Sequence, residues 1–186
     1  MRLAFAAWLA LGLILGRCFE YERIAGTEGA ARQIPSHSSL AAEVDAIGLP
    51  GDVEVRLLAL LAAQYVARRL HYDYRGARGV DMSDPVSIYR HRAVNCQGYS
   101  VLFGAVLTRL LDRADLRIRY EVKTASGYVF FLGRQVLLRP YFTSHVYNIV
   151  YRLEGDRSSL AYVVDSNLYD YTGILFVQDR GPSVSQ

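Results

Sequence analysis

The segment HRAVNCQGYSVLFGAVLTRLL, residues 91–111, places a cysteine at the start of a strongly patterned helix. Asn95 is a favourable N-cap residue, so Cys96 is predicted to be the first helical residue. At such a helix start, unpaired backbone N–H groups and the positive end of the helix dipole favour a thiolate over a thiol. Cys96 is therefore a candidate nucleophile, whereas burial as a small apolar side chain is the ordinary alternative for a lone cysteine. The following apolar residues have the spacing of a helix that buries one face: Leu102, Phe103, Val106, Leu107, Leu110 and Leu111.

The composition is that of a globular domain with one core, because 52% of the 186 residues are hydrophobic and 21% are charged. The formal net charge is only +3, and no basic stripe interleaved with aromatic residues appears, so we expect no nucleic-acid partner. The two cysteines and four histidines have no spacing of the C-x-x-C or H-E-x-x-H kind. We therefore expect neither a metal site nor a cofactor.

Residues 1–18 have the pattern of a leader, in which Arg2 precedes an uncharged apolar run over residues 3–16. This run has the length of a signal-peptide core and is shorter than the roughly 20 residues that span a bilayer as a helix. We expect a signal peptide or, alternatively, a retained anchor that tethers the N-terminus to the membrane. The protein is thus expected to be exported, either to the periplasm or to the surface of the cytoplasmic membrane. If Cys18 belongs to the leader, Cys96 is a single thiol in an oxidising compartment, which favours its use.

Residues 19–38 mix charges with Gly, Pro and Ser, and we predict a linker before a domain at residues 39–186. Helices are predicted over residues 40–47 and from residue 53 to about residue 70. The second is apolar on almost all sides and is expected to be buried. The segment between this helix and Cys96 is broken by Gly and Pro, and a loop of that length is a natural place for substrate contacts.

After the Cys96 helix, the period of the apolar residues changes from 3.6 to 2. A strand is predicted at residues 117–123, followed by a turn at 124–127 and by further strands at 128–132, 135–142, 144–151, 160–165 and 174–178. Helices followed by antiparallel strands predict an α+β fold. In this arrangement the nucleophile lies at a helix start, and the helices pack on a C-terminal antiparallel sheet.

Among the four histidines, His145 lies in a predicted strand whose hairpin partner ends in Asp165. A turn centred on Gly155 would place these two residues directly opposite each other, with Cβ atoms about 5 Å apart. A register shift of two would make them diagonal neighbours on the same face. In either register the carboxylate can accept the imidazole N–H and select its tautomer. A structural role for His145 and simple solvation of Asp165 are the alternatives.

The succession of a buried helix, a tyrosine-bearing loop, a cysteine at a helix start and strands bearing His and then Asp resembles the transglutaminase-like domain, a relative of the papain-like cysteine proteases. The resemblance covers about residues 52–172. It implies a catalytic triad of Cys96, His145 and Asp165 that cleaves, or transamidates, a peptide or isopeptide amide through a thioester. The implied partner is a protein or peptide substrate.

A thioester mechanism also needs donors for the oxyanion, namely the backbone N–H of Cys96 and one further group. The side chains of Gln97, Tyr89 and Tyr74 are the candidates for that second donor. A function of another class is a catalytically inactive binding module at the cell envelope, in which some of the 14 Tyr and 7 Phe residues line a groove. Rapid alkylation of Cys96 at mildly acidic pH distinguishes the enzyme from the binding module.

Overall fold

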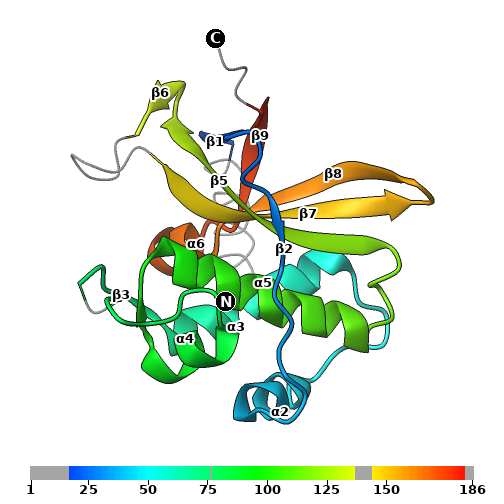
Figure 1. Ribbon diagram of the computed structural model, residues 1–186. Coiled ribbons are helices and arrows are strands. Elements are labelled where there is room, and N and C mark those ends of the chain that lie inside the picture. Colours follow the sequence, from blue (N-terminus) through cyan, green and yellow to red (C-terminus); the bar gives the residue numbers. More distant parts are fainter. Residues whose placement is uncertain (1–16, 76, 137–143, 183–186) are drawn as a thin grey trace, which may run out of the picture.

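Helix α5, Cys96–Arg113, forms the centre of the helical layer in the computed structural model, which describes residues 17–75, 77–136 and 144–182 (Figure 1). The helix begins at the predicted residue, because the side chain of Asn95 accepts hydrogen bonds from the backbone N–H groups of Gln97 and Gly98. Its predicted apolar face is fully buried. Helix α3, Val55–Arg69, packs against it, and the two helices supply much of the larger hydrophobic core.

Shorter elements surround this pair of helices. Helix α2 is Ser39–Asp45, and helix α4 is Pro85–His91, which begins after an Asp84 cap within the predicted loop. Strands β3, His71–Tyr72, and β4, Ala93–Val94, form a small parallel pair at the two ends of that loop. Helix α6, Ser166–Thr172, follows Asp165 and contacts both α3 and α5.

Five strands are paired in a closed ring above the helices (Figure 1). Its members are β1, Phe19–Arg23, β5, Tyr120–Phe131, β7, His145–Glu154, β8, Arg157–Val164, and β9, Phe176–Pro182. All neighbours are antiparallel except β1 and β9, which run parallel. Two short strands, β2, Gly29–Ala30, and β6, Arg134–Gln135, also pair with β5. The chain therefore has the predicted α+β class, with the strands arranged as a barrel.

The prediction of a linker over residues 19–38 is wrong, because this segment contains β1 and β2. Strand β1 lies between β5 and β9 and closes the ring, and Tyr21 at its centre is buried in a second hydrophobic cluster. The structured domain thus begins before residue 39, and the sheet includes strands from both ends of the chain. The helices do not all precede the sheet.

The predicted turn at residues 124–127 is also wrong, because β5 runs without interruption through these positions. The glycine in this segment serves a close approach instead of a turn. A Cβ atom on Gly127 would lie 2.4 Å from the backbone oxygen of Glu22 and 2.8 Å from the hydroxyl of Tyr147. Only glycine therefore permits β5 to pair with β1 and β7 at this point.

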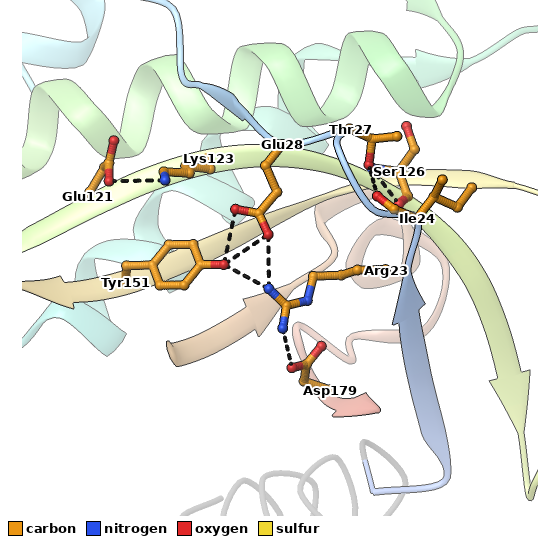
Figure 2. Close-up of polar contacts among 9 residues, drawn as sticks. All are labelled: Arg23, Ile24, Thr27, Glu28, Glu121, Lys123, Ser126, Tyr151 and Asp179. Atoms are coloured by element: carbon orange, nitrogen blue, oxygen red, sulfur yellow. Dashed lines mark hydrogen bonds and ion pairs between the residues drawn. The ribbon is translucent and has the colours of Figure 1, made fainter. Parts of the chain in front are cut away.

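A polar cluster holds β1 in the ring (Figure 2). The guanidinium of Arg23 donates to Glu28 at 2.9 Å, to the Tyr151 hydroxyl at 2.8 Å and to Asp179 at 3.0 Å. These partners come from the β1–β2 connection, from β7 and from β9, so one side chain joins three parts of the barrel. The adjacent turn is secured by Thr27, whose hydroxyl donates to the backbone oxygen of Ile24 at 2.7 Å.

Residues 1–16 of the predicted leader and residues 137–143 of the strand predicted at 135–142 lie outside the described residues. Within the ranges that the structure describes, no helix combines the length and the apolar character needed to cross a bilayer. Cys18 and Cys96 are not joined in a disulfide.

Candidate active site

Cys96 lies where helix α5 meets the first residues of β7. Two hydrogen bonds attach the helix to this strand: the Ser100 hydroxyl donates to the backbone oxygen of Val146 at 2.7 Å, and the Asn148 amide donates to the backbone oxygen of Ser100 at 3.1 Å. These contacts place Cys96 beside His145, whose imidazole acts on the pKa of the thiol through hydrogen bonding and charge. The backbone of Val146 also acts to lower the pKa of this thiol.

His145 is the first residue of β7, and it is almost completely buried, with 4% of its surface exposed. Its Nε2 lies 2.8 Å from Oδ2 of Asp165. Since Nε2 faces the carboxylate, Nδ1 is the ring nitrogen available to Cys96. The structure therefore brings together all three residues that the sequence predicts as a triad.

Asp165 is the N-cap residue of α6 and is only 1% exposed. Its Oδ1 accepts hydrogen bonds from the backbone N–H groups of Asn167 at 2.9 Å and Leu168 at 3.0 Å. Its Oδ2 accepts from His145 and from the hydroxyl of Tyr21, at 2.8 and 2.5 Å. Four donors thus hold the carboxylate in one orientation, which compensates for its burial.

The predicted direct pairing of His145 with Asp165 is wrong, although the two residues are in contact. Glu154 pairs with Arg157, which leaves a two-residue turn at Gly155 and Asp156. Farther along the hairpin, Ala161 is an extra residue on β8, because Val150 pairs with Tyr162 and Tyr151 pairs with Leu160. The two-residue turn and the extra residue Ala161 each shift the register by one from the predicted pairing. Asp165 therefore follows the last paired residue of β8 and approaches His145 diagonally.

The environment of the triad favours a thiolate–imidazolium pair. Burial alone would raise the pKa of the Cys96 thiol, but the hydrogen bond and the charge of His145, with the N–H of Val146, lower it below the usual value. Burial would lower the pKa of His145, but the charge and the hydrogen bond of Asp165, together with Cys96, raise it to about 10. Burial opposes ionisation of Asp165 too, yet His145 and the other donors keep the pKa of its carboxyl below the ordinary value.

The triad opens into a hollow of about 540 Å³. Gln97 and Tyr74, two of the three predicted oxyanion donors, line this hollow beside Cys96. Tyr89 does not. Its hydroxyl donates to Glu43 at 2.6 Å, on the side of the helical layer where Tyr65 and Arg69 also contact that carboxylate. The proposed oxyanion role of Tyr89 is therefore wrong, because helix α4 directs this side chain to Glu43.

Tyr21 is a site residue that the sequence-based prediction missed. Its ring packs edge-on against Tyr147, with centroids 4.9 Å apart, and its hydroxyl reaches Asp165. Burial and the charge of Asp165 raise the pKa of Tyr21 well above its ordinary value, so the hydroxyl remains a hydrogen-bond donor at any physiological pH. The signal that could have identified it is the alternation in FEYER, residues 19–23, which is typical of a strand with one buried face.

The arrangement has the parts that nucleophilic catalysis requires: a thiol with a lowered pKa, a base in contact with it, and a carboxylate that orients the base. Within the described part of the chain, no group of three or more His, Cys, Asp or Glu side chains is placed to hold a metal ion. Comparison of the chain with protein-family models, curated proteins and solved structures finds no match.

Proposed function

We propose that this protein is an exported thiol-dependent enzyme that transfers an acyl group from a peptide or isopeptide amide, with Cys96, His145 and Asp165 as its catalytic triad. The observation that supports it most is the contact of His145 with both Cys96 and Asp165, with Nε2 of the imidazole 2.8 Å from the carboxylate, at the wall of an open hollow. The transglutaminase-like fold remains part of this proposal.

In the first step, the Cys96 thiolate attacks the amide carbonyl carbon, and the carbonyl oxygen becomes an oxyanion. The His145 imidazolium gives the proton on Nδ1 to the amide nitrogen as the C–N bond breaks, and the amine leaves. The enzyme then holds a thioester and a neutral imidazole. Asp165 accepts the other ring N–H throughout, and so keeps the tautomer that directs Nδ1 towards the reacting atoms.

In the second step, water enters the site and the neutral imidazole of His145 removes one of its protons. The oxygen attacks the thioester carbon, the C–S bond breaks, and the carboxylic acid leaves with the thiolate and imidazolium restored. An amine in place of water gives transamidation by the same transfers. We favour hydrolysis, with transamidation second.

The oxyanion is assigned to the backbone N–H of Cys96 and to the side chain of Gln97 or Tyr74. The next two N–H groups of α5, those of Gln97 and Gly98, already donate to Asn95 at 3.0 and 3.2 Å. Both candidate side chains border the hollow, and Gln97 is the nearer to Cys96 in the chain. Gln97→Ala and Tyr74→Phe, compared by their effect on kcat, identify the donor.

The test is cleavage of a mixed peptide library, read by mass spectrometry, together with incorporation of a fluorescent amine into a glutamine-containing protein. The wild-type chain is compared with Cys96→Ala. New peptide termini or amine incorporation that depend on Cys96 support the proposal. Failure of both reactions, combined with ordinary reactivity of the Cys96 thiol towards iodoacetamide, would instead support the inactive binding module.

Export is the second part of the proposal, and it rests on the charge and the apolar run of residues 1–18. Residues 1–40 are fused to a reporter that is active only outside the cytoplasm. We expect the fusion to be active, and a fusion with Leu9→Arg and Leu13→Arg in the apolar run to be inactive. A wild-type fusion that is synthesised but remains inactive would refute export.

A further inference from the structure

The hollow beside the triad is walled mainly by aromatic and aliphatic side chains. They come from segments far apart in the sequence: Phe19 from β1, Tyr72 and Tyr74 from the segment that begins with β3, and Leu168 and Tyr171 from α6. The rings of Tyr72 and Tyr171 are in edge-on contact, with centroids 6.4 Å apart, so two of these segments meet across the wall. Strands and helices therefore both contribute to a mainly apolar wall next to Cys96.

In the described part of its lining, the hollow carries charge at the triad alone. Among the described residues that line the hollow, the only charged side chains are those of Cys96, His145 and Asp165. The carboxylate of Asp165 is 1% exposed and already accepts four hydrogen bonds, so a substrate cation cannot reach it. A charged substrate group would lose hydration in this hollow without gaining a charged partner outside the triad among the described residues.

A second hollow, of about 560 Å³, lies on the other side of Gln97 and has a different character. Its lining includes the hydroxyl side chains of Thr27, Ser83 and Thr124 and the guanidinium of Arg32. Gln97 and Val146 border both hollows. A peptide that lies across Cys96 thus meets a mainly apolar surface on one side and a surface of mixed polar and apolar character on the other.

We infer that the hollow beside the triad selects an uncharged aromatic or aliphatic group of the substrate, next to the amide that reacts with Cys96. The inference rests on the proposed function and adds the substrate class. The volume of about 540 Å³ is in the range that accommodates a small organic ligand, which is enough for a large side chain. An apolar group gains by leaving water there, whereas an ammonium or a carboxylate does not.

The experiment uses four chloroacetamides that carry a phenethyl, an isobutyl, an aminobutyl or a carboxypropyl group. The second-order rate of alkylation of Cys96 in the full chain is followed by mass spectrometry of the peptide that contains it. Each rate is divided by the rate with free N-acetylcysteine, which removes differences in intrinsic reactivity. We expect the phenethyl and isobutyl probes to be favoured over both charged probes by about tenfold or more. Equal ratios, or a preference for either charged probe, would overturn the inference.

Tyr171→Lys is the informative variant, because Tyr171 is 63% exposed and lies at the rim, where a lysine does not disturb the core. We expect it to reduce the preference for the phenethyl probe and to raise the relative rate of the carboxypropyl probe. Ile118→Lys is the matched control, since Ile118 is 83% exposed and does not line the hollow. It should leave the order of the four probes unchanged.

Failure of the substrate class and failure of the proposed function give different results. The same series is run at pH 9, where even an ordinary thiol is substantially ionised. If Cys96 is not an activated nucleophile, iodoacetamide at pH 6 reacts with it no faster than with N-acetylcysteine, but the order of the probes at pH 9 still tests the hollow. If only the substrate class is wrong, Cys96 reacts rapidly at pH 6 and the four probes show no apolar preference.

Discussion

The hydroxyl of Tyr21 donates a hydrogen bond to Asp165, a residue 144 positions away in the sequence. The bond is made to Oδ2, the same oxygen that His145 contacts. Strand β1 therefore closes the barrel and also completes the surroundings of the triad carboxylate. The consequence is that a residue of β1 takes part in orienting a histidine in the other half of the chain.

Tyr21→Phe removes this hydroxyl and keeps the ring. We expect kcat to fall about tenfold with KM little changed, because the carboxylate loses one of the donors that orient it, and a hydrogen bond to a charged group is worth roughly 1.5–3 kcal/mol. Steady-state kinetics on a substrate found in the library measure both constants. Tyr65→Phe is the control, since it removes a tyrosine–carboxylate bond of 2.9 Å, to Glu43, outside the hollow. An equal loss of kcat in both variants would mean that the effect of Tyr21 is only structural.

Asp165 has two roles that different substitutions separate. In Asp165→Asn, the amide oxygen can still cap α6 while the NH₂ group faces His145, so we expect a small change in melting temperature. Turnover should fall severely, and a serine protease that lost its triad carboxylate in this way lost on the order of 10⁴ in kcat. Asp165→Ala should add the loss of the cap, about 1 kcal/mol of unfolding free energy. Thermal melts and turnover of both variants measure the two effects, and full activity in Asp165→Asn would contradict the proposed orienting role.

The pH dependence of Cys96 follows from its pairing with His145. In the wild type, alkylation should continue at a pH where ordinary thiols are protonated, because the pKa of Cys96 is lowered. Turnover should also decline as the pH rises through about 10, since His145 then loses the proton that it gives to the leaving amine. The low-pH limit of alkylation and the high-pH limit of turnover are properties of the coupled Cys96–His145 pair and not of either residue alone. Rates of alkylation and turnover between pH 4 and pH 11 check both limits.

His145→Gln is the comparison for these profiles, because glutamine retains a polar group in a site that is 4% exposed. Burial raises the pKa of the Cys96 thiol, and the imidazolium of His145 lowers it. Without the imidazolium, the pKa of Cys96 should rise and the alkylation profile should move to higher pH. Identical profiles in the two proteins would show that His145 does not activate the thiol. Circular dichroism spectra of the variant establish that it is folded.

The local features of the site could be predicted from sequence because they depend on neighbouring residues. Asn95 caps α5 through the next two backbone N–H groups, and the apolar spacing beyond Tyr99 defines the buried face of that helix. The association of His145 with Asp165 was also accessible, since a hairpin joins them. In each case, the residues that determine the feature lie in one or two short segments of the sequence.

The contacts that were missed depend on distant segments or on a single irregular residue. Ala161 shifts the hairpin register, and nothing in its chemistry distinguishes it from a regular strand residue. Strand β1 was not predicted because residues 20, 22 and 23 are charged, as in a linker. In the structure, Arg23 is paired with Glu28 and Asp179, and these contacts with distant residues cannot be recognised from the sequence (Figure 2). Gly127 was interpreted as a turn residue because the sequence does not show that two other strands approach it closely.

Gly127→Ala tests whether the approach of β1 to β5 controls the site. The added Cβ would lie 2.4 Å from the backbone oxygen of Glu22, far inside contact distance, and backbone atoms cannot move away as a flexible side chain can. We expect a loss of about 2 kcal/mol in unfolding free energy, or roughly 4–8 °C in melting temperature. Strand β1 must shift to relieve the contact, so the bond between Tyr21 and Asp165 should also weaken.

Gly48→Ala is the matched control for this substitution, because among the described residues no atom beyond its chain neighbours lies within 4 Å of the position that its Cβ would occupy. Its melting temperature should remain close to that of the wild type. Activity measured well below the melting temperature then separates the effect of Gly127→Ala on stability from its effect on the triad. If the variant is destabilised but fully active, β1 supports the fold alone. If kcat falls at a temperature where the variant is still folded, and falls no further when Tyr21→Phe is added, then the spacing of β1 and β5 acts on the triad through Tyr21.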